Sequence, residues 1–225
     1  PDEKVKAGTL GKRLAGAGAA ILVIFLILSI ILGASKGDHW RRFFHAYVIG
    51  WSFVASIAIG SDGLAIISHY DTTLLDAKVT HCNDVACTTA TTVTIDSVGD
   101  YGRDGAIAIG SDGLPVVAYR DDSVGGLRIA HCTSITCSAR TAVTIASGPG
   151  AGAAGRTAIA IGPDGFPIIA RSLFGDLVVI HCEDVRCTGR TITNLDTYGV
   201  SGGSPSIAIG SDGLPVISHY SNDSS

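Results

Sequence analysis

The chain has 225 residues, of which 46% are hydrophobic and only 16% are charged, against roughly 25% charged residues in an ordinary soluble domain. The formal charge of -4 divides into +4 over residues 1–55 and -8 over residues 56–225. A segment with a net charge of -8 lacks the basic surface that binds phosphate backbones, which argues against nucleic-acid binding. The only glutamates are Glu3 and Glu183, which excludes catalysis by paired glutamates. A chain that begins at Pro1 and contains no Met is expected to be processed or a fragment.

Residues 15–34 are the first predicted element, a twenty-residue run without a charge. A helix of this length spans about 30 Å, the thickness of the hydrocarbon core of a bilayer. The basic tail at residues 1–14 favours a cytoplasmic N-terminus, so we expect a transmembrane helix that anchors the protein in the membrane. The alternative is a cleaved signal peptide, although its apolar stretch usually has about 7–15 residues. Residues 35–55 are predicted to be a juxtamembrane segment that is helical or resembles a second span.

The rest of the chain is repetitive. The word IAIG occurs four times and is followed each time by Ser-Asp-Gly or Pro-Asp-Gly, at residues 57–60, 107–110, 159–162 and 207–210. A second word, His-Cys-x4-Cys, occurs three times at a spacing of 50 residues, at 81–87, 131–137 and 181–187. Seven occurrences of two words do not arise by chance. The predicted repeat units are residues 56–105, 106–157, 158–205 and the partial unit 206–225.

Each unit resolves into four short predicted strands. In the first unit these are Ile57–Gly60, Leu64–Ser68, Ala77–Cys82 and Thr91–Asp96, with a hairpin turn at residues 60–63. Gly-rich connectors are predicted at Ser97–Gly105 and Ser147–Gly155. A period near 50 residues with four antiparallel strands is typical of a propeller blade.

The predicted fold is therefore mainly β. It is an incomplete β-propeller of four-stranded blades, about three and a third in number, preceded by an N-terminal transmembrane α-helix. Closed propellers have about 4–8 blades, so the ring does not close within this sequence. We expect the open edges to favour self-association, because unpaired strands and apolar sheet faces are templates for it.

All six cysteines lie in the second word, so the repeat favours one disulfide within each unit. The predicted pairs are Cys82–Cys87, Cys132–Cys137 and Cys182–Cys187. Three disulfides indicate an oxidising compartment outside the cytoplasm. The alternative is a zinc site, since a His precedes each first Cys, at His81, His131 and His181. Neighbouring residues of a strand point to opposite faces, which weighs against that alternative.

A candidate binding rim follows the second strand of each unit, where the residues differ although the framework repeats. The candidate ligand-binding residues are His69, Tyr70, Tyr119, Arg120, Arg171, His219 and Tyr220. Aromatic and Arg side chains are enriched in recognition surfaces, and an ordinary solvated rim is the alternative. The turn aspartates Asp62, Asp112, Asp164 and Asp212 are candidate calcium ligands or, more simply, turn-stabilising residues. No catalytic residue, metal or cofactor is predicted.

The repeats resemble a bacterial extracellular β-propeller-type repeat. The resemblance rests on words such as SIAIGSDGLPVIS and HCNDVACTTAT, within residues 56–71, 77–91, 106–121, 127–137, 158–170, 177–187 and 206–220. Their turn is also similar to that of NHL-type and sialidase-like propellers, but the Trp of a sialidase Asp-box is absent. The resemblance therefore implies a scaffold and not a hydrolase.

Residues 1–60 resemble a different protein, the start of a polytopic membrane subunit of the quinol:cytochrome c oxidoreductase called alternative complex III. The resemblance rests on one span followed by HWRRFFHAYVIGW. The two resemblances meet at Ser56–Gly60, and we expect a chimera of two unrelated coding sequences, with a genuine fusion as the alternative. Since IAIG is predicted to be a strand in every unit, any helix before it should end before Ser56.

These observations predict a membrane-anchored protein whose β-propeller repeats lie in the periplasm or on the cell surface. It would act as a binding or structural module without catalysis, contacting the membrane through residues 15–34 and an unidentified protein or glycan through the rim. The alternatives are a fragment of a quinol-oxidising respiratory complex subunit, resting on residues 1–60, and an extracellular propeller hydrolase.

Overall fold

The computed structural model describes residues 55–146, 156–173, 176–197 and 203–221 of the chain. Every regular element in these ranges is a β-strand. The strands are β1 (Ser56–Ile59), β2 (Ala65–Asp71), β3 (Asp76–Cys82), β4 (Ala90–Asp96), β5 (Tyr101–Ile109), β6 (Pro115–Asp121), β7 (Gly126–Cys132), β8 (Arg140–Ala146), β9 (Thr157–Ile161), β10 (Pro167–Leu173), β11 (Asp176–Cys182), β12 (Arg190–Asp196), β13 (Gly203–Ile209) and β14 (Pro215–Tyr220).

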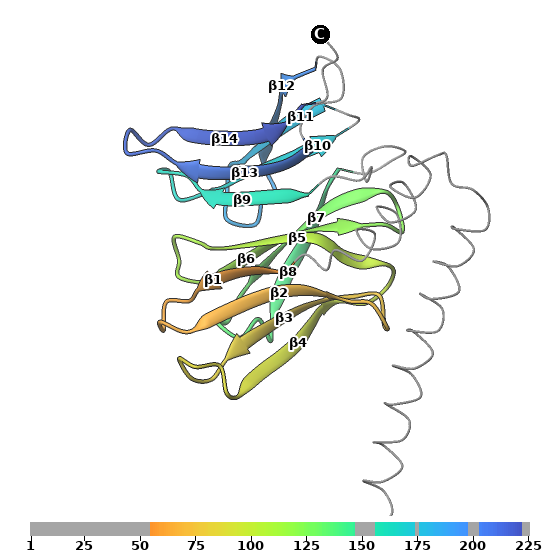
Figure 1. The fold of residues 1–225 in the computed structure, drawn as a ribbon, viewed down its shortest axis with the longest axis vertical. Coiled ribbons are helices and arrows are strands. Elements are labelled where there is room, and N and C mark those ends of the chain that lie inside the picture. Colours follow the sequence, from red (N-terminus) through yellow and green to blue (C-terminus); the bar gives the residue numbers. More distant parts are fainter. Residues whose placement is uncertain (1–54, 147–155, 174–175, 198–202, 222–225) are drawn as a thin grey trace, which may run out of the picture. The chain divides into compact units, whose positions relative to one another are not determined.

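Each repeat forms its own antiparallel sheet with the strands in sequence order (Figure 1). Three sheets have four strands, β1–β4, β5–β8 and β9–β12, and the fourth is the pair β13–β14. This arrangement confirms the mainly β class and the four strands per unit, and it is consistent with propeller-like blades. The prediction that IAIG is a strand in the first unit is also confirmed, because Ser56–Ile59 pairs with β2.

The hairpin between the first two strands has the same geometry in every unit. In the first unit the N–H of Gly60 donates to the carbonyl of Leu64 over 2.8 Å, and Gly63 has a φ of 80°. A residue with a side chain is strained at that φ, so the Gly of the repeated Asp-Gly is required by the turn. The repeated word therefore encodes both the first strand and the tight turn after it.

The strands extend further than the sequence predicted at one end of the sheets. β2 runs to Asp71 and not to Ser68, and β5 begins at Tyr101, inside the segment expected to be a connector. The expected connector Ser97–Gly105 is therefore wrong over its second half, which pairs with β6. In the same way Gly203 starts β13, within the range assigned to the third unit. The connector predicted at residues 147–155 lies outside the described residues.

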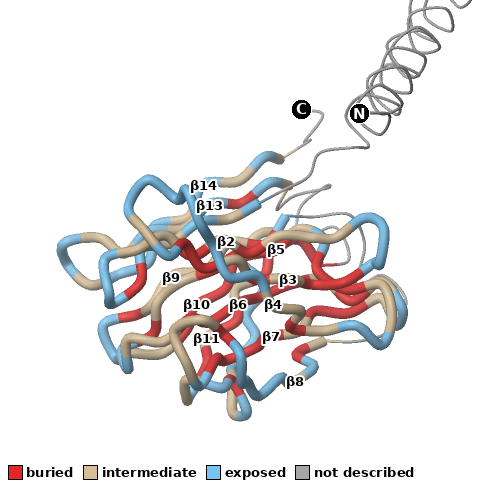
Figure 2. The backbone as a smooth tube through the Cα atoms, turned by 90° about the horizontal axis from the view of Figure 1, so that it is seen from below, coloured by how far each residue is buried: buried red, intermediate tan, exposed pale blue. Residues whose placement is uncertain are grey.

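The core lies between neighbouring sheets. Ile66, Val79 and Ile95 of the first sheet form one cluster with Ile107 and Val117 of the second. The next cluster has the same construction and joins the second sheet to the third, through Val116, Ile129, Ile145, Ile169, Val178 and Ile180. Figure 2 shows the buried residues concentrated in the middle strands and the exposed ones in the turns. The sheets are thus held together mainly by apolar side chains from facing surfaces.

The described part of the chain includes no helix long and apolar enough to cross a membrane. The predicted transmembrane helix at residues 15–34, the basic tail before it and residues 35–54 lie outside the described residues.

Candidate functional site

The predicted rim residues lie in the last residues of the second strands, not beyond them. Successive residues of a strand point to opposite faces of its sheet, so these residues fall into two sets. His69, Tyr119, Arg171 and His219 occupy equivalent positions on one face. Tyr70, Arg120, Ser172 and Tyr220 occupy equivalent positions on the other. The two sets have different partners and therefore different roles.

Two members of the first set, Tyr119 and His219, reach toward the preceding sheet. The hydroxyl of Tyr119 donates to Asp96, the last residue of β4, over 3.0 Å. His219 lies 3.9 Å from Asp196, the last residue of β12. Tyr119 is only 1% exposed, and burial together with the neighbouring Asp96 raises the pKa of its hydroxyl. Tyr119 therefore joins two sheets and is not available to a ligand at the surface.

Arg171 is the most deeply buried member of this set. Its side chain is fully buried, and its Nε donates to the carbonyl of Ser172 over 3.2 Å. Burial, and next the charge of Arg120, lower the pKa of the Arg171 guanidinium to about 10. At the position where Asp96 faces Tyr119, the second sheet has Ala146. His69, in the first sheet, is half-buried and bonded to Thr80 Oγ1 over 2.9 Å.

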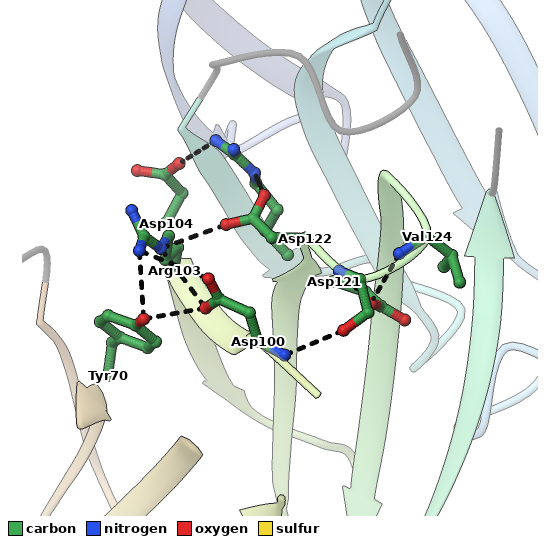
Figure 3. Close-up of polar contacts among 9 residues, drawn as sticks. Tyr70, Asp100, Arg103, Asp104, Asp121, Asp122 and Val124 are labelled. Atoms are coloured by element: carbon green, nitrogen blue, oxygen red, sulfur yellow. Dashed lines mark hydrogen bonds and ion pairs between the residues drawn. The ribbon is translucent and has the colours of Figure 1, made fainter. Parts of the chain in front are cut away.

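Two members of the second set, Tyr70 and Arg120, belong to a polar cluster in the first two sheets, which we call the rim network (Figure 3). It consists of Tyr70, Asp100, Arg103, Asp104, Arg120 and Asp122. The hydroxyl of Tyr70 donates to Asp100 over 2.8 Å and accepts from Arg103 Nη2 over 3.2 Å. The guanidinium of Arg103 also lies over the ring of Tyr70, 4.9 Å from its centre.

The acids of the rim network alternate with its arginines. Nε of Arg103 lies 3.1 Å from Asp122, which also pairs with Arg120. Arg120 in turn lies 3.4 Å from Asp104. Burial raises the pKa of Asp122, and the charge of Arg120 opposes that shift. The side chain of Arg103 is 46% exposed, so it is a member of this network that solvent reaches.

The rim network depends on the start of β5. Gly102 has a φ of 108°, and Asp104 has a φ of 52°, in the region that Asp tolerates better than most residues. The register with β6 shifts on both sides of Arg103, as in a β-bulge, which turns Arg103 and Asp104 outward from the regular ladder. Sequence reasoning missed Asp100, Arg103 and Asp104 because it assigned them to a connector, and it missed Asp122 because it limited the rim of this unit to Tyr119 and Arg120. The signal was present, since charged residues in DYGRDG replace the small ones of the other connectors.

The turn aspartates pair with the histidines of the third strands, a link that sequence reasoning also missed. Oδ2 of Asp62 lies 2.8 Å from Nε2 of His81, and its other oxygen accepts from the N–H of Leu64. Asp112 and His131 repeat the pair at 2.7 Å, as do Asp164 and His181. The signal was the constant order of the two residues, 17 to 19 residues apart. Each carboxylate joins the first hairpin to the third strand.

Removing one of these carboxylates tests their role. In Asp112→Ala, His131, which is 5% exposed, loses the partner of its Nε2, and we expect a loss of about 1–3 kcal/mol in the free energy of unfolding. Asp212→Ala is the matched control, because Asp212 accepts only the turn bond from Leu214 among the described contacts. Urea denaturation measures both. Equal losses in the two variants would contradict a role for the His–Asp pair.

The cysteines form one disulfide within each unit, as the sequence predicted. Bonds join Cys82 to Cys87, Cys132 to Cys137 and Cys182 to Cys187, each across the loop between the third and fourth strands. These sulfurs are bonded to one another and so are not thiolate ligands for zinc. In the first loop Asp84 accepts hydrogen bonds from Thr88 and Thr89, which lowers its pKa to about 2. The three loops share the same backbone hydrogen bonds, such as the one from the N–H of Cys87 to the carbonyl of Asp84.

Neither the turn aspartates nor the disulfide loops gather metal ligands in the described ranges, where no group of three His, Cys, Asp or Glu could hold an ion. No protein-family model and no curated protein matches this chain. The basis for a functional proposal is therefore the rim network and the sheets that position it.

Proposed function

We propose that the repeats form part of an extracytoplasmic β-propeller that acts as a binding module without catalysis and is anchored to the membrane by residues 15–34. Support for the propeller comes from the contacts between first strands of successive sheets, β1 with β5, β5 with β9 and β9 with β13. The innermost strands of blades are adjacent in this way around a propeller axis. Support for a compartment outside the cytoplasm comes from the three disulfides.

The observation that carries the binding role is the rim network. The four turns of the repeats are nearly identical, whereas the opposite end of the sheets varies more and concentrates acids and arginines around Tyr70 in the first two sheets. Folding alone requires no such cluster, because the fourth unit repeats the Tyr as Tyr220 but has Gly203 in place of Arg103, and the third unit has Ser172 in place of Arg120. The half-exposed Arg103 and the ring of Tyr70 are of the residue types enriched in recognition hot spots.

The chemistry of the rim network suits a glycan. Sugar hydroxyls both donate and accept hydrogen bonds, and the alternating carboxylates and guanidinium groups supply both kinds of partner. A few fixed polar groups orient a ligand when their own positions are held by neighbours, as Asp100 and Asp122 hold Arg103. The aromatic ring of Tyr70 adds an apolar surface at the same place. A glycan is therefore the ligand class we propose.

Binding of the full chain to an array of immobilised neutral and acidic oligosaccharides tests this proposal. We expect Arg103→Ala to weaken binding about tenfold or more, because it removes the guanidinium that solvent reaches in the network. Arg186→Ala is the matched control, an exposed arginine in the third disulfide loop, at the other end of its sheet. Absence of binding to every oligosaccharide, or equal weakening in both variants, would contradict a glycan-binding rim.

A further inference from the structure

Contacts between successive sheets follow one rule in this chain. We call the face that is turned toward the next sheet along the chain the front face, and the opposite face the back face. Ile66, Val79 and Ile95 lie on the front face of the first sheet, and Ile107 and Val117 lie on the back face of the second. The second and third sheets meet in the same way, through Val116, Ile129, Ile145, Ile169, Val178 and Ile180. The fold therefore contains two copies of one kind of interface.

A hydrogen bond between turns accompanies each of these interfaces. The hydroxyl of Ser61 donates to the carbonyl of Gly113 in the next turn over 3.0 Å. Ser111 donates in the same way to Gly165, also over 3.0 Å. The bond fixes how far one sheet is displaced along the other. It is thus a marker of the register between sheets.

The back face of the first sheet and the front face of β13–β14 lack such a cover in the described residues. On the back face of the first sheet, Ile57 is 63% exposed, whereas its equivalent Ile107 is 6% exposed. Val85, in the first disulfide loop, is 91% exposed, whereas its equivalent Ile135 packs against the cluster between the first two sheets. On the front face of β13–β14, Val216 is 63% exposed, whereas its equivalent Val116 is fully buried. The exposed residues are those that interior sheets bury.

We propose that these two faces bind each other between copies of the chain, the front face of β13–β14 in one copy docking on the back face of β1–β4 in a second copy. Val216, Ile57 and Val85 occupy the places of Val116, Ile107 and Ile135, which pack in the interfaces inside the chain, so the two faces repeat apolar parts of those interfaces. Ser211 occupies the place of the donors Ser61 and Ser111, and Gly63 occupies the place of the acceptor Gly113. Ser211 and Gly63 are both exposed, so the turn bond can form between copies.

The polar residues on the back face of the first sheet are compatible with this contact. Thr80 replaces the Ala130 of the second sheet, but its hydroxyl is already bonded to Thr92 over 2.8 Å and to His69. Lys78 is paired with Asp71 over 2.5 Å. Covering these groups leaves none of them without a partner, so the cost of burial is limited. The contact is head to tail, and such contacts close into a ring or continue as a filament.

A photo-crosslinking amino acid at position 216 of the full chain tests the contact directly. Copies labelled with heavy nitrogen are mixed with unlabelled copies, so that crosslinks between copies have mixed masses. We expect mixed-mass crosslinks from residue 216 to peptides that contain Ile57 or Val85. Crosslinks to residues 1–54 of the same copy would show that the chain covers its own face and would overturn the proposal, as would the absence of any crosslink.

Charge substitutions measure the strength of the contact. Val216→Lys and Ile57→Lys should each weaken association of the full chain about tenfold or more in sedimentation velocity, because a charge would be buried without a partner. Val98→Lys is the control, since Val98 is 88% exposed and lies between β4 and β5, outside both faces. Equal association of all variants would overturn the proposal. None of these measurements depends on glycan binding, so the two proposals fail separately.

Discussion

Replacing Gly102 by alanine is expected to lower the free energy of unfolding by roughly 2–4 kcal/mol, since backbone strain and steric overlap add at this position. Gly102 has a φ of 108°, a conformation that residues with a side chain rarely adopt. A Cβ there would lie 2.7 Å from Cα of Ala77 and 2.9 Å from its Cβ. Ala77 belongs to β3 and cannot move without displacing the first sheet. Equilibrium denaturation in urea measures the loss.

Gly63→Ala provides the matched control for this variant. Gly63 also has a positive φ, 80°, but a Cβ at that position has no atom within 4 Å. Only the backbone strain of a side chain at positive φ remains, and we expect Gly63→Ala to lower the free energy of unfolding by about 1 kcal/mol. The difference between the two variants isolates the contact between β5 and the first sheet. If Gly63→Ala cost as much as Gly102→Ala, the close approach at Ala77 would not contribute to stability.

The strands of each unit could be predicted because their signals are local. The word IAIG followed by Asp-Gly specifies a strand and a turn that needs a positive φ, and Gly63 has that φ. The disulfides could be predicted for a similar reason, since Cys82 and Cys87 are five positions apart and the same spacing recurs. A local sequence pattern that recurs three or four times is a strong basis for such a prediction.

The rim could be predicted only in part, because its contacts join different sheets. Tyr119 and Arg171 were expected at a surface, but they are buried against neighbouring sheets. What Tyr119 contacts is decided by Asp96, a residue of the preceding unit. No pattern within one unit indicates which residue of another unit will face it. Variation at these positions therefore reflects pairing between sheets as well as any ligand.

The same reasoning explains why Arg103 was missed. It lies in a strand that continues past the repeated word through a β-bulge, and the register shifts that make the bulge have no simple sequence signature. Its partners Tyr70 and Asp122 come from β2 and from the residue after β6. A site assembled from three strands in two sheets becomes visible only once the sheets are placed together.

Stability in this fold should be concentrated in the layers between sheets. Each apolar cluster joins one sheet to the next along the chain, as in repeat proteins whose stability is a sum of units and nearest-neighbour interfaces. Ile129 lies in the layer between the second and third sheets and is fully buried. We expect Ile129→Ala to lower the free energy of unfolding by roughly 2–5 kcal/mol, because buried apolar atoms are removed and a cavity remains in their place.

Ile192→Ala is the control that shows whether the loss expected for Ile129→Ala comes from burial between sheets or from the position of the residue in a paired strand. Ile192 lies in β12 and is paired with β11, but it is 45% exposed. Both variants remove the same atoms from a strand, so a loss that came from β-propensity would be similar for the two. We expect a loss below about 1 kcal/mol for Ile192→Ala, as is usual for exposed positions. A deletion leaves a cavity only where neighbouring atoms surround the deleted ones. A comparable loss for the two variants would therefore mean that the layer between the second and third sheets is not packed as described.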